Sequence, residues 1–146
     1  MNPIIPSDYS DIDCIRVDED YYAISSTFQF LPGNDASAFQ RPCKLGNLWN
    51  IIDDLTQISE DLHWTRMNRY GRGVWAGTLR HYNGRFYLFF GTPDEGYFMT
   101  SASRAEGPWE PLTPLLPEPV GMIALRMWDG RMGKSYFVGI SFCRRI

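Results

Sequence analysis

The feature that most restricts the fold of this chain is a hairpin unit that occurs three times along it. In each copy, a short strand is followed by an acidic or Asn-containing turn and then by a strand rich in Tyr and Phe. The clearest copy joins residues 78–82 and 86–90 through Asn83-Gly84. Asn-Gly between two apolar runs is a strong hairpin signal, because both turn positions need φ > 0. The other copies span residues 14–25 and 124–139. We therefore predict an all-β chain whose repeated units are β-propeller blades.

Outside these hairpins the sequence signals are weaker. Residues 97–102 are predicted to form a further strand, which we place on the outside of the second blade, before a turn at 106–109. Residues 33–46 show no period, and we assign no regular element to them. Residues 120–133 overlap the third hairpin but contain Met, Arg and Gly where a blade strand should be cleaner.

The segment between the first two blades has helical spacing. Its apolar residues recur as on one face of a helix, at Ile51, Leu55, Ile58 and Leu62. The spacing predicts a short helix over residues 51–62. An irregular loop that buries the same side chains is the alternative.

The composition suits a β-rich domain. The chain has 146 residues, of which 44% are hydrophobic and 15% aromatic, so we expect one domain with a substantial core. An aromatic content this high favours β-structure and stacking surfaces. The net charge is −3 with no basic block, which argues against nucleic acid and anionic membranes as main partners. No apolar run is long enough to span a bilayer.

The residue patterns of a metal centre or a disulfide framework are not found in the sequence. The three cysteines, Cys14, Cys43 and Cys143, are odd in number and far apart. Two histidines, His63 and His81, are too few for a histidine-based metal site. We therefore expect no metal and no cofactor. Residues 1–6 contain neither the basic nor the hydrophobic region of a secretory signal, so we expect a cytoplasmic protein.

Three carboxylates crowd the entrance to the first predicted strand. Asp8, Asp11 and Asp13 fall within residues 7–17, and such crowding is costly unless the groups are solvated or used. Loops that lead into strands are common places for functional sites. A solvated acidic turn is the alternative. At this point both interpretations stay open.

The order and spacing of several motifs resemble glycoside hydrolase family 43. The two longest are Tyr-Tyr-Ala-Ile-Ser-Ser-Thr-Phe at 21–28 and Gly-Val-Trp-Ala-Gly-Thr-Leu-Arg at 73–80. The resemblance covers most of residues 2–112, in the stretches 2–5, 8–11, 15–17, 21–33, 73–80, 86–87, 100–102 and 106–109.

This resemblance implies a five-bladed β-propeller with the site in an axial pocket. Members of the family cleave arabinose or xylose units from plant polysaccharides with inversion. The usual catalytic set is a general-base Asp in the first blade, an Asp in the third blade that tunes pKa and orientation, and a general-acid Glu in the fourth. Inversion needs base and acid on opposite faces of the sugar, about 6.5–9.5 Å apart, so that water fits between them.

Position in the motif makes Asp11 the match for the general base. The family loop usually has Pro on both sides of this Asp, whereas Ser10 and Ile12 stand in those places here. Because of this departure, Asp8 and Asp13 are kept as alternatives.

Trp75 and Phe28 match aromatic positions that line the family's pocket. A flat ring that stacks on a sugar face is a sound physical role for both. The alternative is that they pack in the core of the blades.

The resemblance predicts one partial propeller domain over residues 1–146. Its blades are expected at about 8–50 and 72–112, with an incomplete third at about 120–146. The fourth blade with its acid Glu is not found, and 121–124 stands where the third-blade Asp would be. We therefore expect this chain alone to be weakly active or inactive.

The stretches that depart most from the family pattern are 34–46, 119–125 and 140–146. Frame-shifted back-translations of all three can restore family-like sequence. We hypothesise small insertions or deletions in the coding sequence at these places, which resequencing of the source DNA would test.

Three functions remain in competition. The favoured one is a glycoside hydrolase whose partner is a pentose-containing oligosaccharide or polysaccharide. The others are a non-catalytic sugar-binding module and a propeller fragment that binds another protein. The sequence fixes neither the pentose and its linkage nor the oligomeric state.

Overall fold

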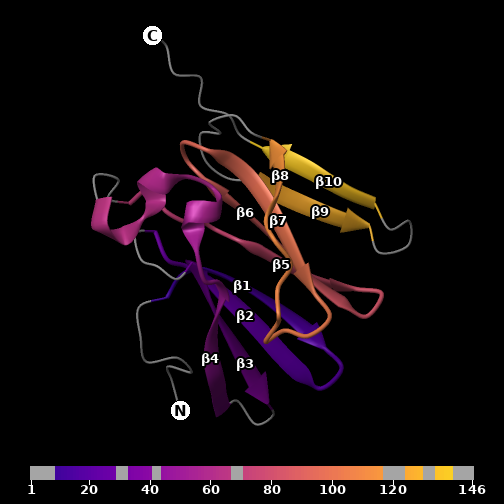
Figure 1. The fold of residues 1–146 in the computed structure, drawn as a ribbon. Helices are drawn as coiled ribbons and strands as arrows, with labels where there is room; N and C mark the ends of the chain where they lie inside the picture. Colours follow the sequence, from indigo (N-terminus) through magenta and orange to yellow (C-terminus); the bar gives the residue numbers. More distant parts are fainter. Residues whose placement is uncertain are drawn as a thin grey trace.

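The computed structural model consists almost entirely of antiparallel strands (Figure 1). It describes residues 9–28, 33–40, 44–66, 71–116, 124–129 and 134–139, with backbone alone for 33–40, 44–48, Trp64 and the last two segments. In these residues one sheet has the order β1-β2-β3-β4, a second has the order β5-β6-β7-β8, and β9 pairs with β10. The strands are β1 (Ser10–Val17), β2 (Asp20–Ser26), β3 (Gly33–Gln40), β4 (Lys44–Ile52), β5 (Thr78–Tyr82), β6 (Arg85–Thr92), β7 (Gly96–Ala102), β8 (Thr113–Leu116), β9 (Ala124–Asp129) and β10 (Lys134–Gly139).

All three predicted hairpins are confirmed. β5 and β6 are joined by Asn83 at φ 50° and Gly84 at φ 76°, the left-handed pair that a tight hairpin needs. β1 and β2 are joined at Asp18, whose φ is 53°. β9 and β10 pair from Ala124↔Gly139 to Asp129↔Lys134.

Two predictions about the strands need correction. The strand predicted at 97–102 is β7, but it is not the outer strand, because β8 pairs with it on the outside. β8 contains Pro114, which is tolerated there because an edge strand need not donate every ladder hydrogen bond. Residues 33–46, to which no element was assigned, contribute β3 and the start of β4.

The helix predicted over 51–62 is not formed. Ile51 and Ile52 end β4, and the chain then makes the 3-10 helices η1 (Leu55–Gln57), η2 (Glu60–Leu62) and η3 (Trp64–Arg66). Asp54 Oδ1 caps η1 by accepting from Thr56 N at 2.8 Å. Ser59 Oγ caps η2 by accepting from Asp61 N at 3.3 Å. Each cap starts a new turn. The irregular loop considered as the alternative is not formed either, but the burial expected with it is found, since Ile51, Leu55 and Leu62 are buried and Ile58 packs against the core.

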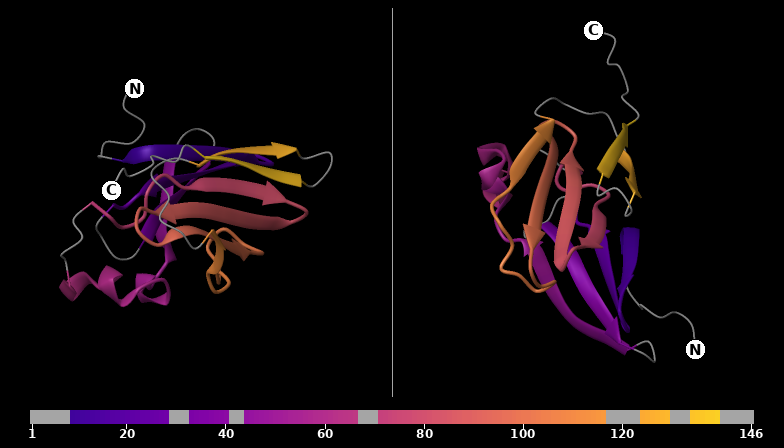
Figure 2. Two further views of the ribbon diagram at one scale, coloured as in Figure 1. Left: turned by 90° about the horizontal axis from the view of Figure 1, so that it is seen from above. Right: turned by 90° about the vertical axis from the view of Figure 1, so that its right-hand side faces the viewer.

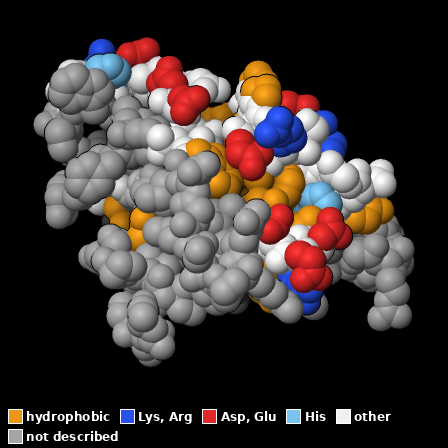
Figure 3. Space-filling model, turned by 90° about the horizontal axis from the view of Figure 1, so that it is seen from below, with side chains coloured by type: hydrophobic (Ala, Val, Ile, Leu, Met, Phe, Trp, Pro, Cys, Tyr) orange, Lys and Arg blue, Asp and Glu red, His pale blue; other side chains and the backbone are white. Residues whose placement is uncertain are grey.

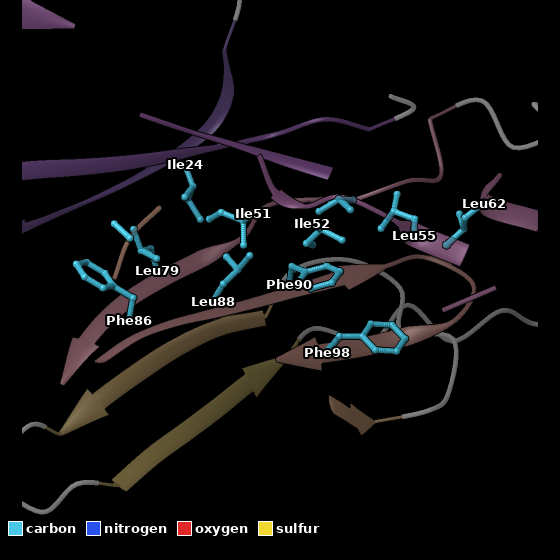
Figure 4. Packing of buried hydrophobic residues seen from close by; sticks show 12 residues of the cluster. Ile24, Ile51, Ile52, Leu55, Leu62, Leu79, Phe86, Leu88, Phe90 and Phe98 are labelled. Carbon is cyan, nitrogen blue, oxygen red and sulfur yellow. The ribbon is translucent and has the colours of Figure 1, made fainter. Parts of the chain in front are cut away.

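A cluster of buried apolar side chains joins the two four-stranded sheets (Figure 4). Phe90 and Phe98 stack within it at a centroid distance of 5.7 Å. Tyr22 of the first sheet meets Phe86 of the second edge to face at 5.0 Å. The labelled members are Ile24, Ile51, Ile52, Leu55, Leu62, Leu79, Phe86, Leu88, Phe90 and Phe98.

Hydrogen bonds add to this contact between the sheets. Trp49 of β4 donates its indole N–H to Ala105 O at 2.8 Å, and Trp109 donates to the same carbonyl at 3.0 Å. Figure 2 shows the result, with the second sheet beside the first and the 3-10 helices at the outside.

The described residues give no sign of a membrane span or of a metal centre. Among them, none of the helices has the length and apolarity needed to cross a bilayer. Nor do they contain a group of three His, Cys, Asp or Glu side chains that could hold a metal ion. Cys14 is a free thiol, while Cys43 and Cys143 lie outside the described residues.

Candidate functional site

Asp11 lies at a β-bulge near the start of β1. The register between β1 and β2 runs from Ser10↔Ser26 to Asp13↔Ile24, so two residues of β1 oppose one of β2. Asp11 has φ 54°, a left-handed conformation that Asp tolerates better than most residues. Bulges redirect side chains and are frequent next to active sites. The bulge therefore turns Asp11 out of the regular alternation of the strand.

Two hydroxyl groups hold the Asp11 carboxylate on one side. Ser10 Oγ donates to Asp11 Oδ2 at 3.0 Å, and Ser26 Oγ donates to the same oxygen at 2.9 Å. Ser25 Oγ donates to Ser10 O at 2.8 Å and so fixes the backbone of the bulge. Within the described part of the chain, Oδ1 accepts no such bond, and Asp11 is exposed. The carboxylate is thus oriented through one oxygen while the residue as a whole is exposed.

Asp13 has different surroundings. Its Oδ2 accepts hydrogen bonds from Leu79 N and from Arg80 Nη1, each at 2.8 Å. Both partners belong to β5, so this carboxylate links the first sheet to the second. The geometry favours Asp11 over Asp13 as a base, because Asp13 is already engaged in holding the sheets together. Asp8, the other alternative, lies outside the described residues.

Phe28 and Trp75 meet at the same end of the sheets as Asp11. Their ring centroids are 6.4 Å apart and their planes are inclined by 67°. Phe28 follows β2 two residues after Ser26, which itself bonds Asp11. Its backbone N–H donates to Val74 O at 3.0 Å, and its carbonyl accepts from Gly73 N. The structure thus places Phe28 and Trp75 in contact and Asp11 at the same end of the first sheet.

Neither aromatic ring is part of the buried core. Val74 is fully buried, whereas the next residue, Trp75, and Phe28 are half-buried. The Trp75 backbone N–H donates to Gly91 O at 3.0 Å and its indole N–H donates to Gly71 O at 2.7 Å. Partial burial is compatible with both interpretations of these aromatics, packing against the blades and stacking on a sugar. The two rings contact each other at the end of the sheets where Asp11 lies.

Charge on the molecular surface is mixed. On the face shown in Figure 3, acidic, basic and apolar side chains are interspersed, and the described basic side chains form no continuous patch.

Residues 1–142 match the family Glycosyl hydrolases family 43. The chain belongs to this family. A putative beta-xylosidase of Xylanibacter ruminicola is 34% identical over 108 residues, which cover 70% of this chain and 19% of the relative. A beta-xylosidase of Formosa agariphila is 28% identical over 139 residues, which cover 94% of this chain and 23% of the relative. The chain thus spans about a fifth to a quarter of the length of these relatives.

Solved structures of family 43 proteins share the fold. The BlXynB protein of Bacillus licheniformis superimposes with a TM-score of 0.77 at 26% identity, over 97% of this chain and 29% of the other. A xylan beta-1,4-xylosidase of Bacillus halodurans superimposes with a TM-score of 0.80 at 24% identity, over 99% of this chain and 28% of the other. These family 43 structures are five-bladed β-propellers. The predicted all-β propeller fold, of which this family 43 chain holds a small part, is confirmed.

Sequence reasoning missed the groups that hold the site. Ser26 could have been suspected, since it lies in the same family 43 motif as Phe28. The contact of Asp13 with Arg80 joins residues 67 positions apart, and no local sequence pattern predicts it.

Proposed function

We propose that this chain carries the general base and part of the sugar-binding wall of a glycoside hydrolase. Its substrates are xylose- or arabinose-containing glycans, and hydrolysis proceeds with inversion. The observation that carries the proposal is the arrangement of Asp11, an exposed residue whose Oδ2 is held by Ser10 and Ser26. Membership of family 43 supports the reaction class.

The chemistry proposed for Asp11 is removal of a proton from water. One carboxylate oxygen must reach the water, while the group as a whole keeps a fixed direction toward the anomeric carbon. Two hydroxyl donors on Oδ2 supply that direction. In this proposal Oδ1, which is not held by either serine, accepts the proton. The general acid that protonates the leaving oxygen is not assigned to any residue of this chain.

The proposed role of Trp75 and Phe28 is to bind the pentose ring. A sugar presents a flat face of C–H groups, which packs favourably on an aromatic ring. The two rings are inclined by 67° in an edge-to-face contact, so they present aromatic surface in two directions. Asp11 then lies beside the bound ring.

Sugar binding is tested first, by calorimetric titration of the chain with xylobiose and with arabinobiose. We expect binding that Trp75→Ala weakens about tenfold or more, which corresponds to the roughly 1.4 kcal/mol expected for a lost aromatic contact. Asp18→Asn is the matched control, since Asp18 is exposed, has a similar φ of 53° and lies at the opposite end of β1. Absence of binding to either sugar contradicts the proposed pocket.

Catalysis is tested with aryl β-xyloside and aryl α-arabinofuranoside substrates. We expect that any turnover by the chain is lost in Asp11→Asn and kept in Asp18→Asn. Turnover that survives in Asp11→Asn would rule out Asp11 as the base.

A non-catalytic sugar-binding role is the second candidate. It is favoured by the contact between Trp75 and Phe28 in a chain to which no general acid is assigned. Binding that survives Asp11→Ala but not Trp75→Ala, without any turnover, would support this function.

A further inference from the structure

Trp75 is carried by a short connection that has no regular structure. Residues 71–75, here called the Trp75 loop, lead toward β5 and contain Gly71 at φ 71°. Such a segment has no ladder of hydrogen bonds within itself. The direction of the Trp75 ring therefore depends on how the loop is fastened to its neighbours.

Backbone bonds fasten the loop at two places. On one side, Gly73 and Val74 exchange hydrogen bonds with Phe28, at the end of the first sheet. On the other side, Trp75 N donates to Gly91 O at 3.0 Å in β6. These bonds fix the last part of the loop, from 73 to 75. The first part includes Gly71, whose carbonyl accepts the Trp75 indole N–H at 2.7 Å.

An ion pair fastens the first part of the loop. Arg72 Nη1 donates to Asp94 Oδ1, and Asp94 lies in the turn between β6 and β7. The Arg72 and Asp94 side chains are 41% and 30% exposed, so the pair is only partly screened by water. Arg72 is the neighbour of Gly71. The pair thus holds the peptide whose carbonyl binds the Trp75 ring.

We propose that Arg72 and Asp94 are positioning residues for Trp75, which set the direction of its ring through Gly71. Neither side chain needs to touch the sugar for this role. The inference extends the proposed function, since it assigns the groups that hold the sugar-binding wall in place. Loss of the pair frees Gly71 to move, and the indole then loses its fixed acceptor.

The first test follows the Trp75 ring without any sugar. In protein labelled with 5-fluorotryptophan, the ¹⁹F resonance of Trp75 is the one that disappears in Trp75→Phe. We expect Arg72→Met to shift or broaden this resonance, and Arg72→Lys, which keeps the charge, to restore it in part. Unchanged resonances of the other tryptophans show that the fold is intact.

The matched control removes another ion pair of the same sheet. Arg85 Nη2 binds Glu110 Oε1 at 2.5 Å, away from the Trp75 loop. We expect Arg85→Met to leave the Trp75 resonance where it is. A Trp75 resonance that is the same in Arg72→Met as in the unmodified protein would overturn the inference, whether or not the chain binds sugar.

The second test measures xylobiose binding by the same variants. Arg72→Met should weaken it about two- to fivefold, the factor that matches the free energy of a partly exposed ion pair. If the unmodified chain binds no pentose sugar, the proposed function fails while the ¹⁹F result still decides the inference. If the chain binds but Arg72→Met binds equally well, the inference fails and the proposed function stands.

Discussion

Asp11 and Asp13 lie two positions apart on β1, but their carboxylates bind different partners. In a regular strand, residues two apart share a face. The bulge between Ser10 and Asp13 breaks this rule, so that Asp13 points to β5 while Asp11 turns to the serine hydroxyls. One structural irregularity thus separates a carboxylate that binds two sheets from one that is open to water.

We predict that Asp13→Ala lowers the free energy of unfolding by about 1–3 kcal/mol, because Leu79 N–H and the Arg80 guanidinium lose their acceptor. Asp13→Asn, which keeps one oxygen acceptor, should cost less. Urea denaturation measures both. Asp53→Ala is the control, since Asp53 is exposed and its loss should change stability by less than about 0.5 kcal/mol. Equal stability of the Asp13 and Asp53 variants would show that the hydrogen bonds from β5 to Asp13 add nothing to the free energy of unfolding.

The sequence was enough to select Asp11 as the candidate base, but it could not predict the hydrogen bonds that Asp11 accepts. Motif order places the residue, because the family pattern is a matter of position along the chain. The bond from Ser26 depends on the register between β1 and β2, which the bulge shifts by one residue. Register is set by packing of the whole sheet and is not visible in either strand alone.

The hairpin of β5 and β6 depends on one residue without a side chain. Gly84 has φ 76°, and a Cβ at this position would meet no atom within 4 Å. We predict that Gly84→Ala destabilises the protein by about 1–2 kcal/mol through backbone strain alone. Gly84→Asn should cost less, since Asn adopts left-handed φ more readily. Thermal unfolding of the two variants is the measurement, and an Ala variant as stable as the Asn variant would contradict the strain argument.

A polar network fastens the outer part of the second sheet. Glu110 accepts hydrogen bonds from Ser101 and Arg85, and these bonds hold the pKa of its carboxyl below the ordinary value of 4.5, with Ser101 the larger cause. A lowered folded-state pKa means that the ionised carboxylate stabilises the fold above about pH 4.5 and that this contribution is lost as pH falls through the folded pKa.

For this network we predict that Ser101→Ala raises the pKa of Glu110 toward its ordinary value. A carboxyl ¹³C titration of Glu110 measures it directly. Glu106→Gln, a substitution at an exposed acidic residue paired with Arg104, serves as the control and should leave the Glu110 titration unchanged. A Glu110 pKa unaffected by loss of the serine hydroxyl would contradict the assigned cause.

Elements with local signals were predictable, and those that depend on distant partners were not. The Asn83-Gly84 turn and the alternating residues beside it predict their hairpin from local sequence alone. β8 reads Thr-Pro-Leu-Leu, which has no alternation and forms a strand only because β7 offers an edge. The helical spacing over 51–62 led to the wrong prediction of a helix. Ile52 is instead paired with Gly33 of β3, and Asp54 caps a separate 3-10 turn.

The two four-stranded sheets share one interior, which makes them a thermodynamic unit. Leu88 is fully buried in the cluster that also contains Ile24 of the first sheet. We predict that Leu88→Ala lowers the free energy of unfolding by about 2–5 kcal/mol. Leu116→Ala, at a side chain that is 49% exposed, should change it by less than about 0.5 kcal/mol.

The same unit should unfold cooperatively. In urea, far-UV circular dichroism and tryptophan fluorescence should give one midpoint, and Leu88→Ala should move both signals together. Two separate transitions would show that the sheets are stable independently. The division of the chain into one domain with blades at about 8–50, 72–112 and 120–146 stays a prediction until such data exist.

The two indole N–H groups that meet at Ala105 O give this protein a natural optical probe. Trp49 comes from the first sheet and Trp109 from the second half of the chain, and both depend on the same carbonyl. Separation of the sheets would move Trp49 from a partly apolar contact into water, and indole emission shifts to longer wavelength in a more polar environment. Docking of one sheet on the other can thus be followed in real time by the wavelength of tryptophan emission, in unlabelled protein.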